Sequence, residues 1–368
     1  MMHLIGNKIK KQIRLRLMDI LILGGTGAMG KHLVDCLLSN ENNIYVTTRS
    51  SRPNGQGVKY ITGNAKDDDF ITSLLERRWD VIVDFMLYKT QELEDRVDKL
   101  LSSTSQYVFI SSARVYANNS QVITEKSPRL LDVCKDEKYL HTDEYALSKA
   151  RQENILLESK DNNWTIIRPY ITYSEDRFQL GVLEKEGWLY RAINGRKVII
   201  GDEILQKFTT LTYGLDVARG ISSLLGKEST MGEVFNITSP HAITWKQVLD
   251  LYINTLNHTK NIKLNIASKS VSDIKQWHSA KYQIDYDRVY NRRFDNKKIN
   301  QYIDTESFLP PEVGLEICLN EFLDNPKFRY IDWKVEALKD KQAGNHTSII
   351  EPIGIKNKVK YLLYRYVL

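Results

Sequence analysis

The sequence predicts an α/β fold with a doubly wound parallel sheet, in which helices cover both faces of the strands. Between residues 19 and 168, short apolar runs alternate with amphipathic stretches, which is the pattern of buried parallel strands joined by helices. The first apolar run also breaks into the glycine-rich stretch GGTGAMG, after which apolar residues resume with helical spacing. Folds of this kind hold their ligands at the carboxyl ends of the strands.

Each strand and helix of this fold is predicted from the pattern of apolar residues in its own segment. The apolar run at 19–24 predicts the first strand, and the stretch at 28–39 predicts the first helix because its apolar residues recur at helical spacing. Parallel strands need crossover connections, which are usually helical. Further strands are expected at 44–48, 58–62, 80–85, 106–111 and 164–168, with helices at 67–77, 90–102 and 143–159.

The alternation loosens after the last of these strands. We interpret 18–173 as the sheet domain and 174–345 as a smaller mixed α/β substrate lobe, with segments near 209–238 returning to the sheet domain. Residues 1–17 are interpreted as a basic N-terminal extension, and 346–368 as a basic amphipathic C-terminal tail.

The formal charge of +6, from 52 basic and 46 acidic residues, is concentrated at the two ends of the chain. Residues 1–17 contain five basic residues and residues 355–368 contain four, and neither segment contains an acid. The remainder has three more acidic residues than basic ones. A nearly neutral body disfavours a nucleic-acid partner, and none is expected.

Cysteine usage and hydropathy disfavour two further classes of protein. The three cysteines are scattered and form no C-x-x-C pair, so neither a disulfide framework nor a metal site is expected. No apolar run approaches the roughly 18 residues that a membrane span needs. We therefore expect a cytoplasmic protein whose thiols are reduced. The cysteines are Cys36, Cys134 and Cys318.

Two stretches suggest a proton-transfer site. Tyr145 and Lys149 lie four apart on one predicted helix, where their side chains can meet. A free tyrosine titrates near pH 10, and an adjacent ammonium group lowers that value, so the pair is a workable proton shuttle. An ordinary amphipathic helix would show the same pair. Ser112 follows a predicted strand, at the edge where this fold keeps reactive groups, although a serine there can also simply cap the strand.

Taken together, GGTGAMG, FISSARVY and YALSK occur in the order and rough spacing of a known family. From about Met18 to about Leu256 the sequence resembles the extended short-chain dehydrogenase/reductase family, the NAD-dependent epimerase/dehydratase group that acts on sugar nucleotides. The resemblance implies a Rossmann fold and hydride transfer to or from a nicotinamide cofactor, coupled to proton transfer.

Carried over residue by residue, the resemblance implies a catalytic set and a cofactor site. Tyr145 is the general acid/base, Lys149 tunes it and holds the nicotinamide ribose, and Ser112 orients the sugar hydroxyl or keto oxygen. The glycines cradle the pyrophosphate, and the amide of Asn64 contacts the adenine. The implied cofactor-binding residues are Gly24, Gly27, Ala28, Met29, Gly30, Thr48, Arg49, Asn64 and Lys149.

Two departures from the family pattern bear on the cofactor and on the reaction. Many NAD-using members carry an acid at the end of the second strand, where this chain has Thr48 followed by Arg49. No carboxylate would repel a 2′-phosphate there and a guanidinium could bind it, so NADP is favoured over NAD, although a solvated arginine is the alternative. Members that eliminate water carry an Asp-Glu pair where this chain has Ala113-Arg114, which disfavours 4,6-dehydration.

The expected substrate is a nucleotide sugar. Arg177 and Arg191 are candidates for binding its diphosphate, and Trp188 for stacking on its base, while solvated charges and a lobe-core aromatic are the alternatives. The leading hypothesis is a 4-epimerase or a related keto-sugar reductase of bacterial surface-polysaccharide synthesis. The competing hypothesis is a non-enzymatic relative that binds the cofactor and acts as an RNA-binding or regulatory protein.

Two further expectations concern partners. We expect a homodimer. The C-terminal tail places four apolar residues on one helical stripe with Lys and Arg around it, which suits an anionic membrane surface or, equally, packing against a partner subunit. The stripe residues are Val359, Leu362, Leu363 and Tyr366.

Overall fold

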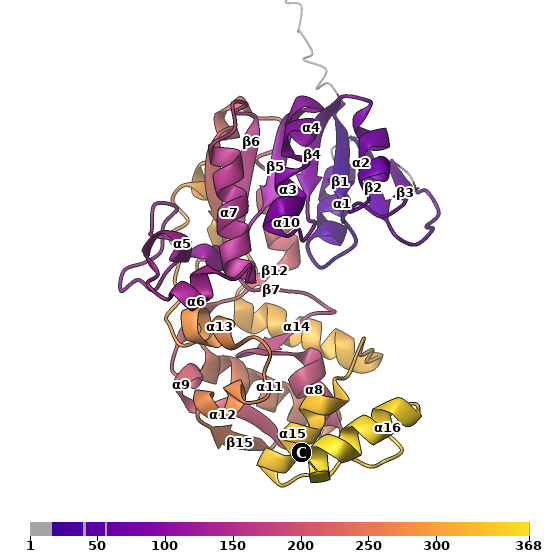
Figure 1. Ribbon diagram of the computed structural model, residues 1–368, viewed down its shortest axis with the longest axis vertical. Helices are drawn as coiled ribbons and strands as arrows, with labels where there is room; N and C mark the ends of the chain where they lie inside the picture. Colours follow the sequence, from indigo (N-terminus) through magenta and orange to yellow (C-terminus); the bar gives the residue numbers. More distant parts are fainter. Residues whose placement is uncertain (1–16, 40–41, 56, 368) are drawn as a thin grey trace, which may run out of the picture.

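The computed structural model describes residues 17–39, 42–55 and 57–367, so the predicted extension lies outside the described residues except for Leu17. The predicted fold class is confirmed. Seven parallel strands form one sheet in the order β13-β6-β5-β4-β1-β2-β3 (Figure 1). They are β1 (Asp19–Leu23), β2 (Asn43–Thr48), β3 (Val58–Thr62), β4 (Trp79–Asp84), β5 (Thr104–Ile110), β6 (Trp164–Pro169) and β13 (Glu233–Ile237).

Side chains alternate across this sheet and so build two cores. Ile20 and Ile22 of β1 face the core formed with α1 and α10, whereas Leu21 and Leu23 face the core on the opposite side, because successive side chains of a strand point to opposite faces. The sheet helices are α1 (Gly30–Leu38), α2 (Asp68–Leu75), α3 (Thr90–Glu94), α4 (Val97–Ser102), α7 (Tyr145–Leu157) and α10 (Gly214–Ser222).

The strand order creates a crevice between β1 and β4. The chain runs outward from β1 through β2 to β3, and then returns to place β4, β5 and β6 on the other side of β1. The connections leave β1 and β4 in opposite directions at their carboxyl ends, which opens a crevice where such sheets bind ligands.

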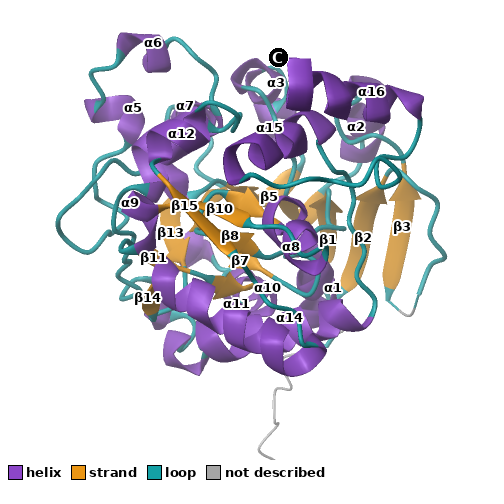
Figure 2. Cartoon of the chain, turned by 90° about the horizontal axis from the view of Figure 1, so that it is seen from below, coloured by secondary structure: helices purple, strands orange, loops and turns teal. Residues whose placement is uncertain are grey.

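In the second lobe, short strands lie among helices (Figure 2). The core of this lobe is separate from those of the sheet and contains the aromatic residues Trp188, Trp245 and Tyr252. Its strands are β7 (Thr172–Tyr173), β8 (Gln179–Leu180), β9 (Leu183–Glu184), β10 (Val198–Gly201), β11 (Phe208–Thr210), β12 (Thr212–Tyr213), β14 (Ala242–Thr244) and β15 (Ile266–Lys269). Its helices are α8 (Lys185–Ile193), α9 (Asp202–Leu205), α11 (Trp245–Lys260), α12 (Val271–Lys275), α13 (Lys281–Gln283), α14 (Pro311–Asp324), α15 (Trp333–Ala343) and α16 (Ile355–Leu362). Two short helices, α5 (Leu130–Val133) and α6 (Glu137–Leu140), lie beside α7.

The chain crosses between the lobes more than once. Helix α10 packs on α1, and β13 pairs with β6, so residues 214–237 belong to the sheet domain. A later segment returns as well, because Ile299 and Phe308 join the core beneath the sheet. That second return has no helical or strand periodicity and was not predicted. In the part of the chain that is described, no helix is both long and apolar enough to cross a membrane.

Candidate active site

The glycine loop between β1 and α1 folds tightly against its surroundings at two points and is open at a third. Gly24 has a φ of 71°, a region that favours glycine, and a Cβ there would lie 2.9 Å from the sulfur of Met86. A Cβ on Gly30 would lie 2.6 Å from the backbone of Gly25, so the start of α1 must be this close to the loop. A Cβ on Gly27 would meet nothing within 4 Å, which leaves open space beside its backbone.

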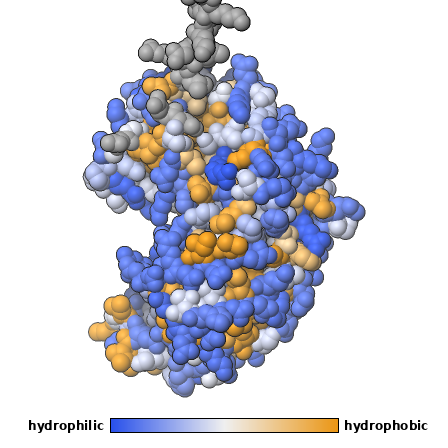
Figure 3. All heavy atoms as spheres, turned by 180° about the vertical axis from the view of Figure 1, so that it is seen from behind, coloured by the Kyte–Doolittle hydropathy of each residue, from blue (hydrophilic) through white to orange (hydrophobic). Residues whose placement is uncertain are grey.

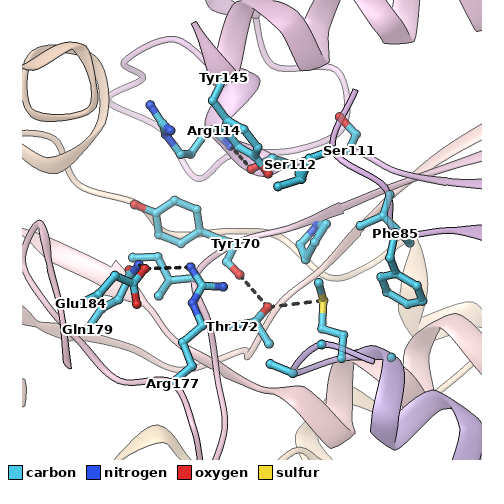
Figure 4. Close-up of a pocket in the computed structure, with 18 of the residues that line it drawn as sticks. Phe85, Ser111, Ser112, Arg114, Tyr145, Tyr170, Thr172, Arg177, Gln179 and Glu184 are labelled. Carbon is cyan, nitrogen blue, oxygen red and sulfur yellow. Dashed lines mark hydrogen bonds and ion pairs between the residues drawn. The ribbon is translucent and has the colours of Figure 1, made fainter. Parts of the chain in front are cut away.

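A cavity of about 480 Å³ lies at the carboxyl ends of the strands, between the glycine loop and the second lobe (Figure 4). Ser112, which follows β5, and Tyr145, the first residue of α7, both line it. Glu144 caps the helix by accepting a hydrogen bond from the backbone N–H of Ala146, and so sets the position at which α7 begins. The structure therefore brings two of the three predicted catalytic residues to one cavity.

A cation lies beside the phenol of Tyr145. The guanidinium of Arg114 is 5.2 Å from the centre of the Tyr145 ring and forms a 2.7 Å ion pair with Glu144. Arg114 also lines the cavity. Sequence reasoning used this residue only to disfavour dehydration and missed that it lies next to the predicted base.

Lys149 lies behind Tyr145, one turn along α7. Its side chain is 2% exposed, and its Nζ donates a 2.9 Å hydrogen bond to the carbonyl oxygen of Ile110, the last residue of β5. Burial lowers the pKa of the ammonium to about 8, against the opposing influence of the carboxylates of Asp84 and Glu153. The ammonium is thus held at the end of the strand that leads to Ser112.

A buried network holds the ends of β5 and β6 in place. Glu153 of α7 is completely buried and accepts a 2.6 Å hydrogen bond from the hydroxyl of Ser111. Its carboxylate also binds Arg168 of β6 through two hydrogen bonds of 2.6 and 2.8 Å, and Arg129 at 3.2 Å. Because the carboxylate is paired with two guanidinium groups, its charge is compensated in the interior.

The second lobe contributes charged and polar side chains to the same cavity. Arg177 faces it and forms a 3.1 Å ion pair with Glu184 (Figure 4). Arg288, which was not predicted, also lines the cavity although it is buried, and it donates to the carbonyl oxygen of Gly181 at 3.0 Å and to the hydroxyl of Tyr170 at 3.2 Å. The only sequence signal for Arg288 was the cluster of arginines and tyrosines in DYDRVYNRR.

The expectation for Trp188 and Arg191 was wrong. Trp188 is fully buried and stacks on Tyr252 with ring centres 4.4 Å apart. Arg191 is also fully buried and forms ion pairs of 2.7 Å with Glu336 and 2.9 Å with Asp340. Neither residue lines the cavity, because the side of α8 that carries them packs against α11 and α15.

Residues 20–238 match the NAD dependent epimerase/dehydratase family. The chain belongs to this family. Its sheet, glycine loop and the cavity lined by Ser112 and Tyr145 all lie within or against the matched region.

Three known proteins are similar to this chain. The chain is 27% identical, over 243 residues, to the chloroplast stem-loop binding protein of 41 kDa b from Arabidopsis thaliana; the match covers 61% of this chain and 60% of that protein. Among solved structures, dTDP-glucose 4,6-dehydratase from Bacillus anthracis, in complex with NAD, aligns with a TM-score of 0.63 at 20% identity, covering 84% of this chain and 97% of the enzyme. UDP-glucuronic acid 4-epimerase from Bacillus cereus, in complex with NAD, aligns with a TM-score of 0.61 at 16% identity, covering 84% and 98%.

The dinucleotide that the family name implies fits the residues at the carboxyl edge of the sheet. A second cavity, of about 360 Å³, lies next to the first and shares Gly24, Phe85 and Leu87 with its lining. The open space beside Gly27 would accept a pyrophosphate, whose charge the start of α1 would stabilise. Three of the predicted cofactor residues, Thr48, Arg49 and Asn64, line the second cavity, and Ala28, Met29 and Gly30 line the first.

Arg49 has a free side chain among the described residues. It is exposed, and no hydrogen bond or ion pair is formed by its guanidinium. The neighbouring Thr48 is buried and donates a 3.0 Å hydrogen bond to the carbonyl oxygen of Ser50, while the Oδ1 of Asn64 accepts from the backbone N–H of Lys66 at 3.1 Å. An anion in this cavity would therefore find one unpaired cation.

Substitutions at Gly27 and Gly30 test cofactor binding and folding stability separately. We expect Gly27→Ala to leave the unfolding temperature unchanged, because the added methyl enters open space, and to weaken NADP and NAD binding by at least about tenfold, because it fills the place of the pyrophosphate. Gly30→Ala is expected to destabilise the protein by roughly 1–3 kcal/mol, because its methyl would overlap the Gly25 backbone. Thermal unfolding and calorimetric titration measure both effects. Full cofactor affinity in a folded Gly27→Ala variant would contradict this placement.

Proposed function

We propose that this chain is an NAD(P)-dependent nucleotide-sugar 4-epimerase or a closely related keto-sugar reductase of surface-polysaccharide synthesis. The observation that carries the proposal is the shared cavity, which Ser112 and Tyr145 line together with the glycine loop and with Arg177 and Arg288 of the second lobe. Membership of the NAD-dependent epimerase/dehydratase family supports the same chemistry.

The chain's own residues supply the proton transfer. A bound nicotinamide would accept or donate the hydride. We assign the proton exchange with the sugar oxygen to the hydroxyl of Tyr145, whose ring centre lies 5.2 Å from the guanidinium of Arg114. Ser112 donates a hydrogen bond to that same oxygen and so holds it near Tyr145. Arg177 and Arg288 line the same cavity, where Arg177 is paired with Glu184 and Arg288 with Asp287, and we assign to them the contact with a negatively charged group of the substrate.

The residues beside Tyr145 disfavour dehydration as the reaction. Elimination of water needs a second acid and base next to the tyrosine. Position 113 is alanine, position 114 is arginine, and the nearby carboxylate of Glu144 is engaged in the ion pair with Arg114. No further carboxylate from the described residues lines this part of the cavity, since Glu184 is on the opposite lobe and is paired with Arg177.

Arg49 is proposed to select NADP over NAD. A charge-assisted contact with a 2′-phosphate contributes roughly 1.5–3 kcal/mol, or about ten- to a hundredfold in affinity. Arg49→Ala should therefore weaken NADP binding by about that factor and barely change NAD binding, while Thr48→Asp should shift the preference towards NAD. Calorimetric titration of both cofactors against the three proteins measures the change. A wild-type protein that prefers NAD, with a ratio unaffected by Arg49→Ala, would refute the assignment.

Product analysis tests the function itself. The full chain is incubated with a panel of UDP- and dTDP-linked sugars and their 4-keto derivatives, with NAD or NADP(H), and the sugars are followed by NMR. A 4-epimerase inverts one carbon without net change in the cofactor, whereas a reductase consumes NADPH in step with loss of the keto sugar. Absence of both reactions across the panel, under conditions where the cofactor binds, would count against the proposal.

A non-enzymatic, RNA-binding or regulatory function is the second candidate. It is favoured by one observation, the similarity to the Arabidopsis stem-loop binding protein. Gel-shift titration with RNA stem-loops, with and without NADP, tests it directly. Tight binding to RNA that is equally strong in a Tyr145→Phe variant, together with no turnover of sugars, would favour this candidate over the enzyme.

A further inference from the structure

The C-terminal helix lies at the end of the second lobe (Figure 1), and several of its apolar side chains are exposed. Helix α16 continues through Leu363–Val367, and five of its residues are between 39% and 81% exposed. Figure 3 shows a cluster of apolar surface at the lower left, where this helix lies in the reversed view. We call these five residues the apolar stripe: Ile355, Val359, Leu362, Leu363 and Tyr366.

Basic residues border the stripe on both sides. At about 100° per residue, Ile355, Val359 and Leu362 of α16 fall within one third of the helix circumference, and Leu363 and Tyr366 continue the stripe on the π-helical turn that follows. Lys356 and Lys360 then lie along one border and Lys358 along the other. Lys360 also forms a 3.7 Å ion pair with Asp332, and Arg365 of the following turn donates to the carbonyl oxygen of Asn345 at 3.1 Å. Residues 352–368 contain no acid, so the whole segment is positive.

The opposite side of the helix is anchored to the lobe. Tyr361 is 1% exposed; its hydroxyl donates a 2.8 Å hydrogen bond to Asp340 of α15, and its ring contacts Trp333 at 6.4 Å between centres. The hydroxyl also accepts a 3.0 Å hydrogen bond from the backbone N–H of Thr347. Because these contacts position the helix without using the stripe, the apolar side chains are presented by a fixed support.

We propose that the apolar stripe docks this protein onto an anionic phospholipid surface. A helix with an apolar face bordered by lysine and arginine inserts that face at the boundary between headgroups and acyl chains, while its cations meet anionic headgroups. The charge of the segment is complementary to such a surface. The helix lies at the end of the lobe away from the sheet, so docking leaves the crevice between the lobes accessible (Figure 1).

A second copy of the chain is the less suitable occupant. A two-fold contact through the stripe would bring the lysines of one copy next to those of the other, without acids from either segment to pair with them. The stripe is also small, since a helix of 13 residues is roughly 20 Å long and about 10 Å wide, against the roughly 800 Å² per partner of a stable interface.

Vesicle co-sedimentation of the full chain tests the proposal. We expect binding to vesicles of phosphatidylcholine with phosphatidylglycerol, weaker binding at high salt, and little binding to phosphatidylcholine alone. The double variant Val359→Asp/Leu362→Asp should lower the partition onto anionic vesicles at least about tenfold, and Lys356→Gln/Lys358→Gln should lower it several-fold. All four positions are at least partly exposed, so the variants are expected to fold.

Helix α14 offers the matched control. Its residues Val313 and Ile317 are exposed one turn apart, beside Glu312 and Glu316 in place of basic residues. The variant Val313→Asp/Ile317→Asp should sediment with anionic vesicles like the wild type. Failure of the wild type to bind anionic vesicles, or unchanged binding after Val359→Asp/Leu362→Asp, would overturn the proposal. A dimer in analytical ultracentrifugation that is lost in this variant, without vesicle binding, would assign the stripe to a second copy.

Discussion

Replacing Tyr145 with phenylalanine is expected to lower kcat by about 10²–10⁴-fold while changing cofactor affinity by no more than a few-fold. The substitution removes the hydroxyl that faces the cavity and leaves the ring, which sits against the guanidinium of Arg114. The glycine loop and the second cavity, where the dinucleotide is proposed to bind, are untouched. Steady-state kinetics on the substrate found in the sugar panel, with calorimetric titration of the cofactor, separates the two effects.

Tyr282→Phe is the matched control for this change. Tyr282 stacks near Tyr139 with ring centres 4.7 Å apart and does not line the catalytic cavity. Removal of the Tyr282 hydroxyl should leave kcat within about twofold of the wild type. Wild-type turnover by Tyr145→Phe would show that another group moves the proton, and equal losses in both variants would point to a structural effect.

Replacing Lys149 with methionine is expected to abolish turnover and to stabilise the cofactor-free protein at the same time. The ammonium is buried, and its pKa is lowered to about 8 because the interior disfavours the charged form. At pH 7 this lowered pKa corresponds to roughly 3 kcal/mol of stability that the native state loses, and an uncharged side chain of similar length would restore it. Urea unfolding measures the gain, and titration should show weaker cofactor binding because the proposed contact with the ribose is gone.

The effect of Lys149 on the free energy of unfolding should depend on pH, and the lowered pKa sets the direction of that change. Between about pH 8 and pH 10.5 the unfolded chain keeps a proton on Lys149 that the native state has released, so the stability of the wild type rises with pH across this window. Lys149→Met has no such proton, so its advantage over the wild type should shrink as the pH approaches 10. Lys149→Arg, which keeps the charge, should show no stabilisation. A destabilised Lys149→Met variant at pH 7, or an advantage that does not change with pH, would contradict the account.

Local sequence patterns determined the sheet and the glycine loop. The alternation of Ile20, Leu21, Ile22 and Leu23 places side chains on both faces of β1, which is possible only for a strand covered on both sides. The glycines after β1 likewise indicate a tight turn into a helix. Both features depend only on residues that are close together in the sequence, so they could be predicted without the structure.

The spacing of Tyr145 and Lys149 could also be predicted from the local sequence. The residues that contact these two side chains could not. The sequence placed them on one helix face, whereas the contacts of Lys149 with Ile110 and of Arg114 with Glu144 depend on where β5 ends relative to α7. Sequence spacing predicts that two side chains can meet. It does not predict which carbonyl or carboxylate lies beside them.

The substrate side of the site was decided only by tertiary structure. Arg191 and Trp188 were expected in the cavity, yet Arg191 is paired with Glu336 and Asp340, acids that lie 145 and 149 positions further along the chain. Arg288 enters the cavity instead. Arg191 can be buried because Glu336 and Asp340 compensate its charge, so its place depends on distant residues that the fold brings together. Local pattern therefore determined the fold and the glycine loop, while tertiary packing decided which side chains of the second lobe line the cavity.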